Sequence, residues 1–127
     1  MEVKIDTREK FHVITIKESI LAANMTADME KCLIPFLQTP VKNIVLNLQH
    51  VAQVDETFAA SLVTLQQSFY EQMASFVVCC LQPKVEKWLD NQEMLEVMNV
   101  TPSESEAWDI VQMEEIEREF FDGEEKQ

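Results

Sequence analysis

The sequence predicts a single α/β domain with a mixed central β-sheet of four to five strands and about four helices. Two short apolar runs rich in branched side chains, at 43–48 and 75–81, are typical of strands that are buried on both faces. Segments with helical spacing of apolar residues alternate with these strands. The chain has 127 residues, which is the size of one domain with its own core.

An opening β-hairpin is predicted at the N-terminus. Val3 and Ile5 alternate with charged residues, and a second apolar run extends over 11–16. The charged residues at 8–10 lie between the two runs and indicate the turn.

A helix is predicted next, over 25–37, where apolar residues recur at helical spacing. Asn24 or Thr26 is the expected N-cap, because a short polar side chain can accept a hydrogen bond from a free N–H of the first turn. Pro35 is expected to kink this helix or to end its regular part, since proline has no N–H and crowds the preceding turn. Pro40 closes the segment.

The most informative segment is 43–62, in which the first buried strand leads through a polar turn into a second helix. Asp55 is expected to cap that helix, because its carboxylate can accept the free N–H groups at the positive end of the helix dipole. Thr57 lies in the first turn, so a phosphate on its hydroxyl would meet N–H donors as well as the carboxylates of Asp55 and Glu56. Two interpretations of Thr57 stay open: a phosphorylation switch, and a structural residue whose hydroxyl supports the cap.

The second helix is predicted to have one apolar and one polar face. With a rotation of about 100° per residue, the core-facing residues are Phe58, Ala59, Leu62, Val63, Leu65, Phe69 and Tyr70. The polar face, which is expected to meet water or a partner, contains Ser61, Thr64, Gln67, Ser68 and Glu71. For Phe58, both ordinary packing and a role as an anchor for a partner stay open.

The next part of the chain is predicted to add a strand, a short helix and an edge strand. Residues 75–81 are predicted to form the second buried strand. Pro83 is expected to occupy the first helical position of a short helix that continues over 84–90. Residues 95–98 are predicted to form the last strand, at an edge of the sheet.

The final helix has the clearest start signal in the sequence. Thr101 and Glu104 have the spacing of a capping box, and Pro102 is expected at the first helical position. The apolar residues that this signal leads into the final helix are Ala107, Trp108, Val111, Met113 and Ile116.

The charge of the chain restricts the ligands that it can bind. The formal net charge is −13, and from Glu86 onward 14 acidic residues accompany three basic ones. Such a field repels nucleic acid and anionic lipid, and it favours a basic protein partner. The alternative is an acidic face that only interacts with solvent.

No membrane insertion is expected from the sequence. Residues 1–10 contain no apolar signal core, and the longest apolar run, 76–81, falls far short of the ~20 residues that a spanning helix needs. The sequence therefore predicts a soluble, cytoplasmic protein.

The sequence does not predict an enzyme. Gly123 is the sole glycine, which excludes a glycine-rich phosphate loop. His12 and His50 do not belong to a pattern of metal-ligating or catalytic residues. No cofactor or metal is therefore expected.

The three cysteines, Cys32, Cys79 and Cys80, are predicted to be small buried hydrophobic residues in a reducing compartment. Neighbours on a strand point to opposite faces, so Cys79 and Cys80 are not expected to share a metal. The methionines with core-like spacing, which are expected to fill gaps in the core, are Met25, Met29 and Met113.

The order of elements and three segments resemble a known family. The segments are NIVLNLQHVAQVDETFAASL at 43–62, SFVVCCLQPKVEKWLDNQEML at 75–95 and TPSESEAW at 101–108. They are similar to the bacterial anti-sigma factor antagonists, the founding type of STAS domain. The resemblance covers about residues 3–115, and it implies one STAS-like domain at 1–120 followed by an acidic tail at 121–127.

The turn motif of that family, D-S-S-G or D-S-T-G, is only partly kept. Asp55 matches the acidic residue and Thr57 matches the phosphoacceptor hydroxyl. Glu56 stands in place of the first serine, Phe58 in place of the glycine, and Ala60 in place of a second common glycine. We expect these changes to weaken phosphotransfer, because Glu56 adds like charge and Phe58 removes backbone freedom.

The resemblance implies a regulatory protein-binding module that docks a kinase-type anti-sigma factor, or another ATPase, and is switched by phosphorylation at Thr57. Residues 19–22 stand in place of the family's G-x-L-D turn, which contacts the partner. The residues predicted to bind a partner are Asp55, Glu56, Thr57, Phe58, Ser61, Leu21, Ala22, Ala23 and Asn24. The oligomeric state stays open.

Two other functions stay open as well. The same domain can be a constitutive STAS subunit of a transporter ATPase complex, with no phosphorylation switch. A ligand-binding or catalytic domain would need a pocket that the sequence does not indicate.

Overall fold

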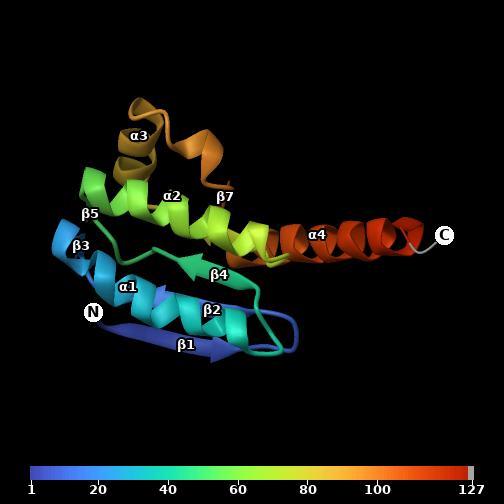
Figure 1. Cartoon of the computed structure of the whole chain (residues 1–127). Coiled ribbons are helices and arrows are strands. Elements are labelled where there is room, and N and C mark those ends of the chain that lie inside the picture. Colours follow the sequence, from blue (N-terminus) through green and yellow to red (C-terminus); the bar gives the residue numbers. More distant parts are fainter. Residues whose placement is uncertain (126–127) are drawn as a thin grey trace.

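The central sheet of the computed structural model has five strands in the order β1-β2-β4-β6-β7 (Figure 1). β1 is antiparallel to β2 and the other neighbours are parallel, so the sheet is mixed, as predicted. The strands are β1 (Val3–Thr7), β2 (His12–Ile16), β4 (Ile44–Asn47), β6 (Phe76–Cys79) and β7 (Val100–Thr101). The structure describes residues 1–125, with side chains described through residue 120.

Two further strands and the helices complete the described chain. β3 (Ile20–Leu21) and β5 (Gln53–Val54) pair in parallel outside the main sheet. Within residues 1–125, the α-helices are α1 (Thr26–Leu33), α2 (Glu56–Glu71), α3 (Pro83–Asn91) and α4 (Glu104–Glu125). The short 3₁₀ helices are η1 (Ala23–Met25), η2 (Ile34–Gln38) and η3 (Leu95–Val97). The predicted fold class is thereby confirmed.

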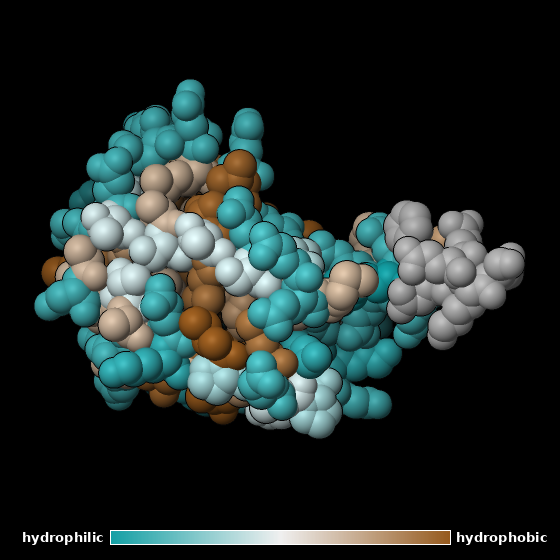
Figure 2. All heavy atoms as spheres, in the orientation of Figure 1, coloured by the Kyte–Doolittle hydropathy of each residue, from teal (hydrophilic) through white to brown (hydrophobic). Residues whose placement is uncertain are grey.

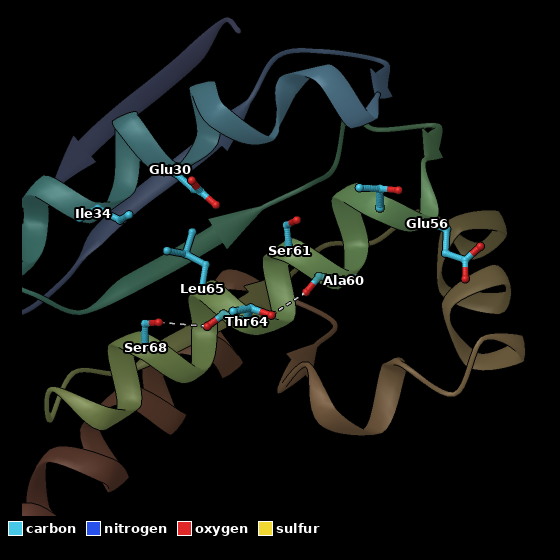
Figure 3. A pocket seen from close by; sticks show the side chains of 9 residues that line it. Glu30, Ile34, Glu56, Ala60, Ser61, Thr64, Leu65 and Ser68 are labelled. Atoms are coloured by element: carbon cyan, nitrogen blue, oxygen red, sulfur yellow. Dashed lines mark hydrogen bonds between the residues drawn. The ribbon is translucent and has the colours of Figure 1, made fainter.

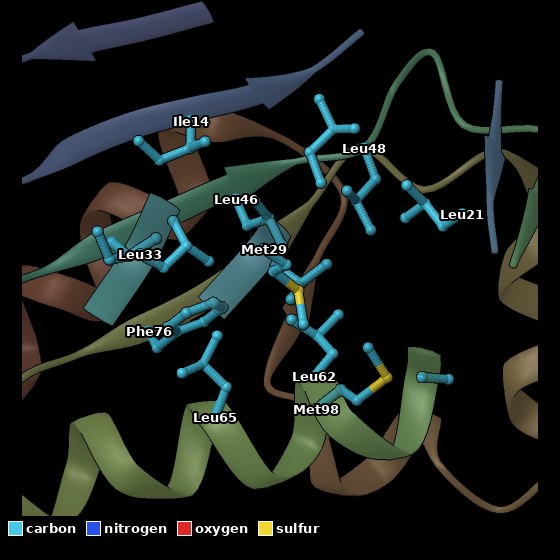
Figure 4. Packing of buried hydrophobic residues seen from close by; sticks show 14 of the residues in the cluster. Ile14, Leu21, Met29, Leu33, Leu46, Leu48, Leu62, Leu65, Phe76 and Met98 are labelled. Carbon is cyan, nitrogen blue, oxygen red and sulfur yellow. The ribbon is translucent and has the colours of Figure 1, made fainter. Parts of the chain in front are cut away.

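The sheet is buried on both faces, as its apolar strands predict. One face packs against α1, α2 and α3 and forms the larger core, to which the sheet contributes Ile14, Leu46 and Phe76 (Figure 4). The other face packs against α4 through residues such as Val45 and Val77. The two layers of helices therefore lie on opposite faces of the sheet.

The packing of α2 confirms its predicted apolar face. Phe58 and Phe69 are 0% exposed and lie in the larger core. Gln66 is buried in the same face, which its residue type does not predict. Its Nε2 donates to the carbonyl oxygen of Phe76 at 2.7 Å and to that of Met98, so the buried amide is hydrogen-bonded.

The prediction of an edge strand at 95–98 is wrong. Residues 95–97 form η3, and the edge strand is β7, which pairs in parallel with β6. Between them, Asn99 has a φ of 53°. A short apolar run without alternation fits a strand and a buried turn equally well, so periodicity alone does not distinguish them.

The start of α4 is also corrected. Thr101 is a strand residue of β7, Pro102 precedes the helix, and α4 begins at Glu104. The side-chain cap comes from Ser103, whose Oγ accepts the backbone N–H of Glu106 at 3.2 Å. Ser103 and Glu106 have the same capping-box spacing as Thr101 and Glu104. Because Thr101 pairs with β6 as part of β7, the helix is capped by Ser103 and not by Thr101.

α1 differs from the prediction at its start and agrees with it at its end. Neither Asn24 nor Thr26 caps the helix, because η1 leads directly into α1 and the N-cap Met25 makes no side-chain cap hydrogen bond. Pro35 ends the regular part as predicted, since α1 stops at Leu33 and η2 follows.

Met113 does not join the core, contrary to the prediction. Its side chain is 59% exposed, and that of Ile116 is 65% exposed, whereas Ala107 and Val111 of the same helix are buried. The backbone of α4 is helical through Glu125. The domain limit at residue 120 and the acidic tail stay predictions, because residues 126–127 and the side chains from residue 121 lie outside what is described.

Cys80 corrects the expectation that the two adjacent cysteines point to opposite faces. β6 ends at Cys79, and Cys80 has a φ of 62°, which breaks the alternation of the strand. Both side chains pack on the α4 side of the sheet. Burial, together with the neighbouring Cys80 thiol, raises the pKa of the Cys79 thiol. Cys79 is buried as predicted, whereas Cys32 and Cys80 are half-buried.

Two helices end in left-handed residues that are not glycine. Met73 follows α2 with a φ of 63°, and Glu93 follows α3 with a φ of 60°. After α2, the N–H of Ala74 donates to the carbonyl oxygen of Phe69 at 2.9 Å, and an equivalent bond closes α3. This is the Schellman arrangement, in which glycine is favoured because it has no Cβ.

We expect Met73→Gly to raise the free energy of unfolding by about 0.5 to 1 kcal/mol, because glycine relieves the steric cost of the left-handed conformation. Little packing is lost, since Met73 is 58% exposed. Urea unfolding followed by circular dichroism measures the change. The control is Gln72→Gly, where φ is −100° and glycine should give no gain. Lower or unchanged stability of Met73→Gly contradicts the expectation.

Tyr70 connects α2 with α4 and with the turn before β7. Its hydroxyl donates to Oε1 of Glu114 at 2.8 Å and accepts from Nδ2 of Asn99 at 2.6 Å. Burial, followed by the hydrogen bond with Glu114 and its charge, raises the pKa of Tyr70 above the ordinary value. The fold therefore favours the neutral hydroxyl.

We expect the free energy of unfolding to fall as the pH rises above about 10, since Tyr70 ionises at a higher pH in the folded chain than in the unfolded one. The stabilisation that comes from the raised pKa is fully present at any pH below the pKa of Tyr70 in the unfolded chain. It is lost as the pH rises toward the pKa of Tyr70 in the folded chain. Tyr70→Phe should weaken this alkaline loss and lower the stability at neutral pH by about 1 to 2 kcal/mol. Urea unfolding between neutral and alkaline pH tests both effects; equal slopes for the two proteins would refute the first.

Candidate functional site

The start of α2 displays Thr57 on the surface of the domain, as predicted. Asp55 is the N-cap with extended backbone angles, and its Oδ1 accepts the backbone N–H of Thr57 at 2.8 Å. Thr57 is the second residue of α2 and its side chain is exposed. The hydroxyl therefore lies at the positively polarised end of a central helix.

Hydrogen bonds hold two distant segments together beside this turn. The N–H of Asp55 donates to the carbonyl oxygen of Leu21 at 2.8 Å, and the N–H of Ala52 donates to that of Ser19 at 2.7 Å. β3 and β5 pair between these bonds. Residues 19–22 thus form one surface with the turn that precedes α2.

A groove of about 550 Å³ runs between α1 and α2 (Figure 3), and Thr57 is one of the residues that line it. Glu30 of α1 and Ser61 of α2 project into the space between the two helices. Ile34, which begins η2, is 45% exposed and adds an apolar side to the groove. Figure 2 shows apolar surface along this groove, with paler and hydrophilic surface on either side. The remaining lining residues are Glu56, Ala60, Thr64, Leu65 and Ser68.

Beyond Glu56, the wall that α2 contributes to the groove has no charge. No Asp, Glu, Lys or Arg lies between Glu56 and Glu71. The hydroxyls of Thr64 and Ser68 donate to carbonyl oxygens of their own helix, each at 3.2 Å. The wall can therefore be covered by a partner with little loss of hydration. The absence of charge suits the core of a protein interface, where charged residues are depleted.

The structure separates the predicted partner-binding residues into exposed and buried ones. Leu21 and Phe58 are 0% exposed, so the prediction that they contact a partner is corrected; both fill the core beneath the surface. Ala22 and Ser61 are half-buried. The exposed ones are Ala23, Asn24, Asp55, Glu56 and Thr57.

The contribution of α1 to the groove was not predicted from the sequence. Glu30 and Ile34 lie far from α2 in the chain. The spacing of apolar residues did not indicate which surface Ile34 would face. The uncharged run of α2 was a usable signal, because about a quarter of the chain is charged, 26%.

The histidines and acidic side chains give no sign of a metal centre. His12 is 5% exposed; its Nε2 donates to the carbonyl oxygen of Val41 at 2.8 Å, and its Nδ1 lies 2.9 Å from Oγ1 of Thr7. It is a packed, hydrogen-bonded residue of β2. Among the described residues, no group of three or more His, Cys, Asp or Glu side chains is arranged to hold a metal ion. Within the same range, no helix has the length and apolar composition needed to cross a bilayer.

Comparisons with known proteins give one family and a consistent fold. The sequence matches the family described as STAS domain over residues 2–107. No curated protein matches the sequence. All the solved structures described next are below 25% identical to the chain, so they show the shared fold alone.

Three similar structures illustrate this fold. A putative anti-sigma factor antagonist from Thermotoga maritima is 19% identical, with a TM-score of 0.72 and coverage of 87% of this chain and 94% of that one. A substituted form of RsbS from Moorella thermoacetica is 19% identical, with a TM-score of 0.70 and coverage of 88% and 96%.

The third is the anti-sigma factor antagonist SpoIIAA. Its unphosphorylated form is 16% identical, with a TM-score of 0.68 and coverage of 87% and 96%. Its phosphorylated form, from Bacillus, is 14% identical, with a TM-score of 0.62 and coverage of 87% and 99%.

We expect Asp55→Ala to lower the free energy of unfolding by about 1 kcal/mol, because the N–H of Thr57 loses its acceptor. Asp55→Asn keeps an oxygen acceptor and should cost only about 0.3 kcal/mol from the lost charge at the helix start. Urea unfolding of both variants, with Glu56→Ala as a neighbouring control, measures the difference. Equal losses for Asp55→Ala and Asp55→Asn would contradict the capping role.

Proposed function

This chain belongs to the STAS domain family, and we propose that it is a regulatory, non-catalytic binding module of the anti-sigma factor antagonist type. Its partner is a kinase-type anti-sigma factor, and phosphorylation of Thr57 weakens the complex. Because such a kinase uses ATP, the complex belongs in the cytoplasm.

The observation that supports this proposal is the exposed hydroxyl of Thr57 at the capped start of α2, beside a groove whose α2 wall is uncharged beyond Glu56. A kinase can reach this hydroxyl without unfolding any part of the domain. The structural neighbour SpoIIAA is known in an unphosphorylated and a phosphorylated form, which makes a phosphate switch reasonable on this fold.

The docking surface combines the turn before α2 with the segments beside it. Ala23, Asn24, Asp55 and Glu56 are exposed around Thr57, and the groove continues the surface along α2. Leu21 and Phe58 support this surface from within the core. A partner therefore contacts the exposed residues around Thr57 and the uncharged wall of α2 that continues from them.

The charges around Thr57 explain why a phosphate would oppose docking. A phosphate adds about −1.5 to −2 charges, and no Lys or Arg is among the residues that line the groove. Glu30 and Glu56 line the same groove, and Asp55 already uses the N–H of Thr57. The phosphate would increase a local negative charge that no side chain in the groove compensates.

Two of the three changes in the turn motif, Glu56 and Phe58, have different consequences in the structure. Phe58 is an ordinary residue of α2 and packs in the core, so this turn does not use the freedom of a glycine. Glu56 lies at the end of the groove, with its carboxylate turned away from α1 (Figure 3). The acidic neighbour stays the stronger obstacle to phosphotransfer. It also favours the second candidate, a constitutive subunit of a transporter ATPase complex that is never phosphorylated.

The first test is to recover the tagged chain from its native cell and to identify what binds it. We expect a kinase-type ATPase that, with ATP, adds one phosphate at Thr57, as located by mass spectrometry. Thr57→Ala should abolish the modification, whereas Thr64→Ala, which removes another exposed threonine of α2, should not. A transporter ATPase without phosphorylation would favour the second candidate, and recovery of neither would contradict both.

The second test measures how charge at Thr57 affects binding of the recovered kinase. Thr57→Glu should raise the dissociation constant by at least about tenfold, through repulsion at the docking surface. Ser105→Glu adds the same charge on the opposite side of the sheet, at an exposed position in α4, and should leave binding unchanged. Equal effects of the two variants would show that net charge alone is responsible.

A further inference from the structure

α4 continues well beyond the sheet on which it packs (Figure 1). Ala107 and Val111 are its buried apolar residues. Further along, Arg118 donates to Oγ of Ser75 at 3.1 Å and to Oδ1 of Asn43 at 3.4 Å. These contacts fix the middle of α4 at the end of the sheet and leave an outward-facing side.

Apolar side chains occupy that outward-facing side. Met113 and Ile116 are 59% and 65% exposed, and Phe120, at 63%, continues the same face. At 3.6 residues per turn, these positions lie on the side of α4 opposite Val111 and Arg118. We call Met113 and Ile116 the α4 stripe. Exposed apolar residues three positions apart are the kind of anchor that a second helix packs against.

The surroundings of the α4 stripe are strongly acidic. α4 contains ten acidic residues and one basic residue, Arg118, which is already hydrogen-bonded to the sheet. Glu117 and Glu119 are exposed on the two sides of the stripe. A second copy of this chain, or an anionic lipid surface, would bring like charge against these carboxylates.

We propose that the α4 stripe is a docking site for an amphipathic helix of a basic protein, with apolar residues on one side and Lys or Arg on the flanks. The apolar side covers Met113 and Ile116, and the basic flanks meet Glu117 and Glu119. The partner thereby removes exposed apolar surface and neutralises part of the acidic field of α4.

This site is separate from the surface around Thr57. α4 packs on one face of the sheet, whereas α1 and α2 pack on the other. A helix bound to the α4 stripe would therefore leave the groove between α1 and α2 open. The inference does not depend on phosphorylation of Thr57 or on the identity of the kinase.

The test uses the full chain and two synthetic helical peptides that share the same leucines at the a and d positions of a heptad. One peptide has Lys at the flanking e and g positions and the other has Glu. Fluorescence anisotropy should show binding of the Lys peptide and none of the Glu peptide. The double variant Met113→Gln with Ile116→Gln, which keeps the net charge, should weaken binding by at least about tenfold. The matched control Ile5→Gln with Ile20→Gln, which replaces exposed apolar residues of β1 and β3, should not weaken it.

A second measurement locates the peptide without any substitution. In the full chain with ¹³C-labelled methionine methyl groups, the Lys peptide should shift the signal of Met113 and leave those of the buried Met29 and Met98 unchanged. Binding that persists in the double variant would mean that charge alone attracts the peptide, and it would overturn the proposal. Absence of binding, equal binding of the Glu peptide, or self-association of the chain through Met113 and Ile116 would overturn it as well.

Discussion

The packing of α2 against the sheet is the interaction on which the candidate site depends. Phe58, Leu62 and Phe69 are at most 2% exposed and lie in the larger core. Each such side chain contributes about 1.5 to 3 kcal/mol when fully buried, so α2 cannot rotate without a large loss of stability. With Phe58, Ala59 and Leu62 in the core, Thr57 is left on the exposed side of the first turn. The cap by Asp55 then fixes where the helix begins.

The sheet separates two surfaces of different chemistry. The groove between α1 and α2 has an uncharged wall with acidic residues at its edges, whereas α4 combines an apolar stripe with dense negative charge. A partner that fits one of these surfaces does not fit the other, since the first presents small neutral side chains and the second favours basic groups. A domain of this size can therefore have two partners, one on each face of its sheet.

Much of the fold was predictable because burial on both faces leaves a strong pattern in the sequence. The apolar runs at 43–48 and 75–81 correctly indicated the central strands, and Asp55 correctly indicated the start of α2. The errors lie where pairing or backbone conformation competes with a local signal. Thr101 has the spacing of a capping residue, yet it pairs with β6 and leaves the cap to Ser103. The chain has a single glycine, so Cys80 and other non-glycine residues adopt the left-handed conformations. These positions could not be predicted, because glycine is the residue type that usually indicates such a conformation.

The sequence by itself determined the order of the central strands and the α-helices, the exposed position of Thr57 and the acidic character of the C-terminal helix, because each depends on neighbouring residues and their periodicity. Tertiary structure decided which surfaces these residues share. It brought Glu30 and Ile34 beside α2, buried Leu21 and Phe58, and left Met113 and Ile116 on the side of α4 that faces away from the sheet. The physical reason is that helical periodicity specifies how residues are arranged around a helix, whereas only the packing of that helix decides which side meets the sheet.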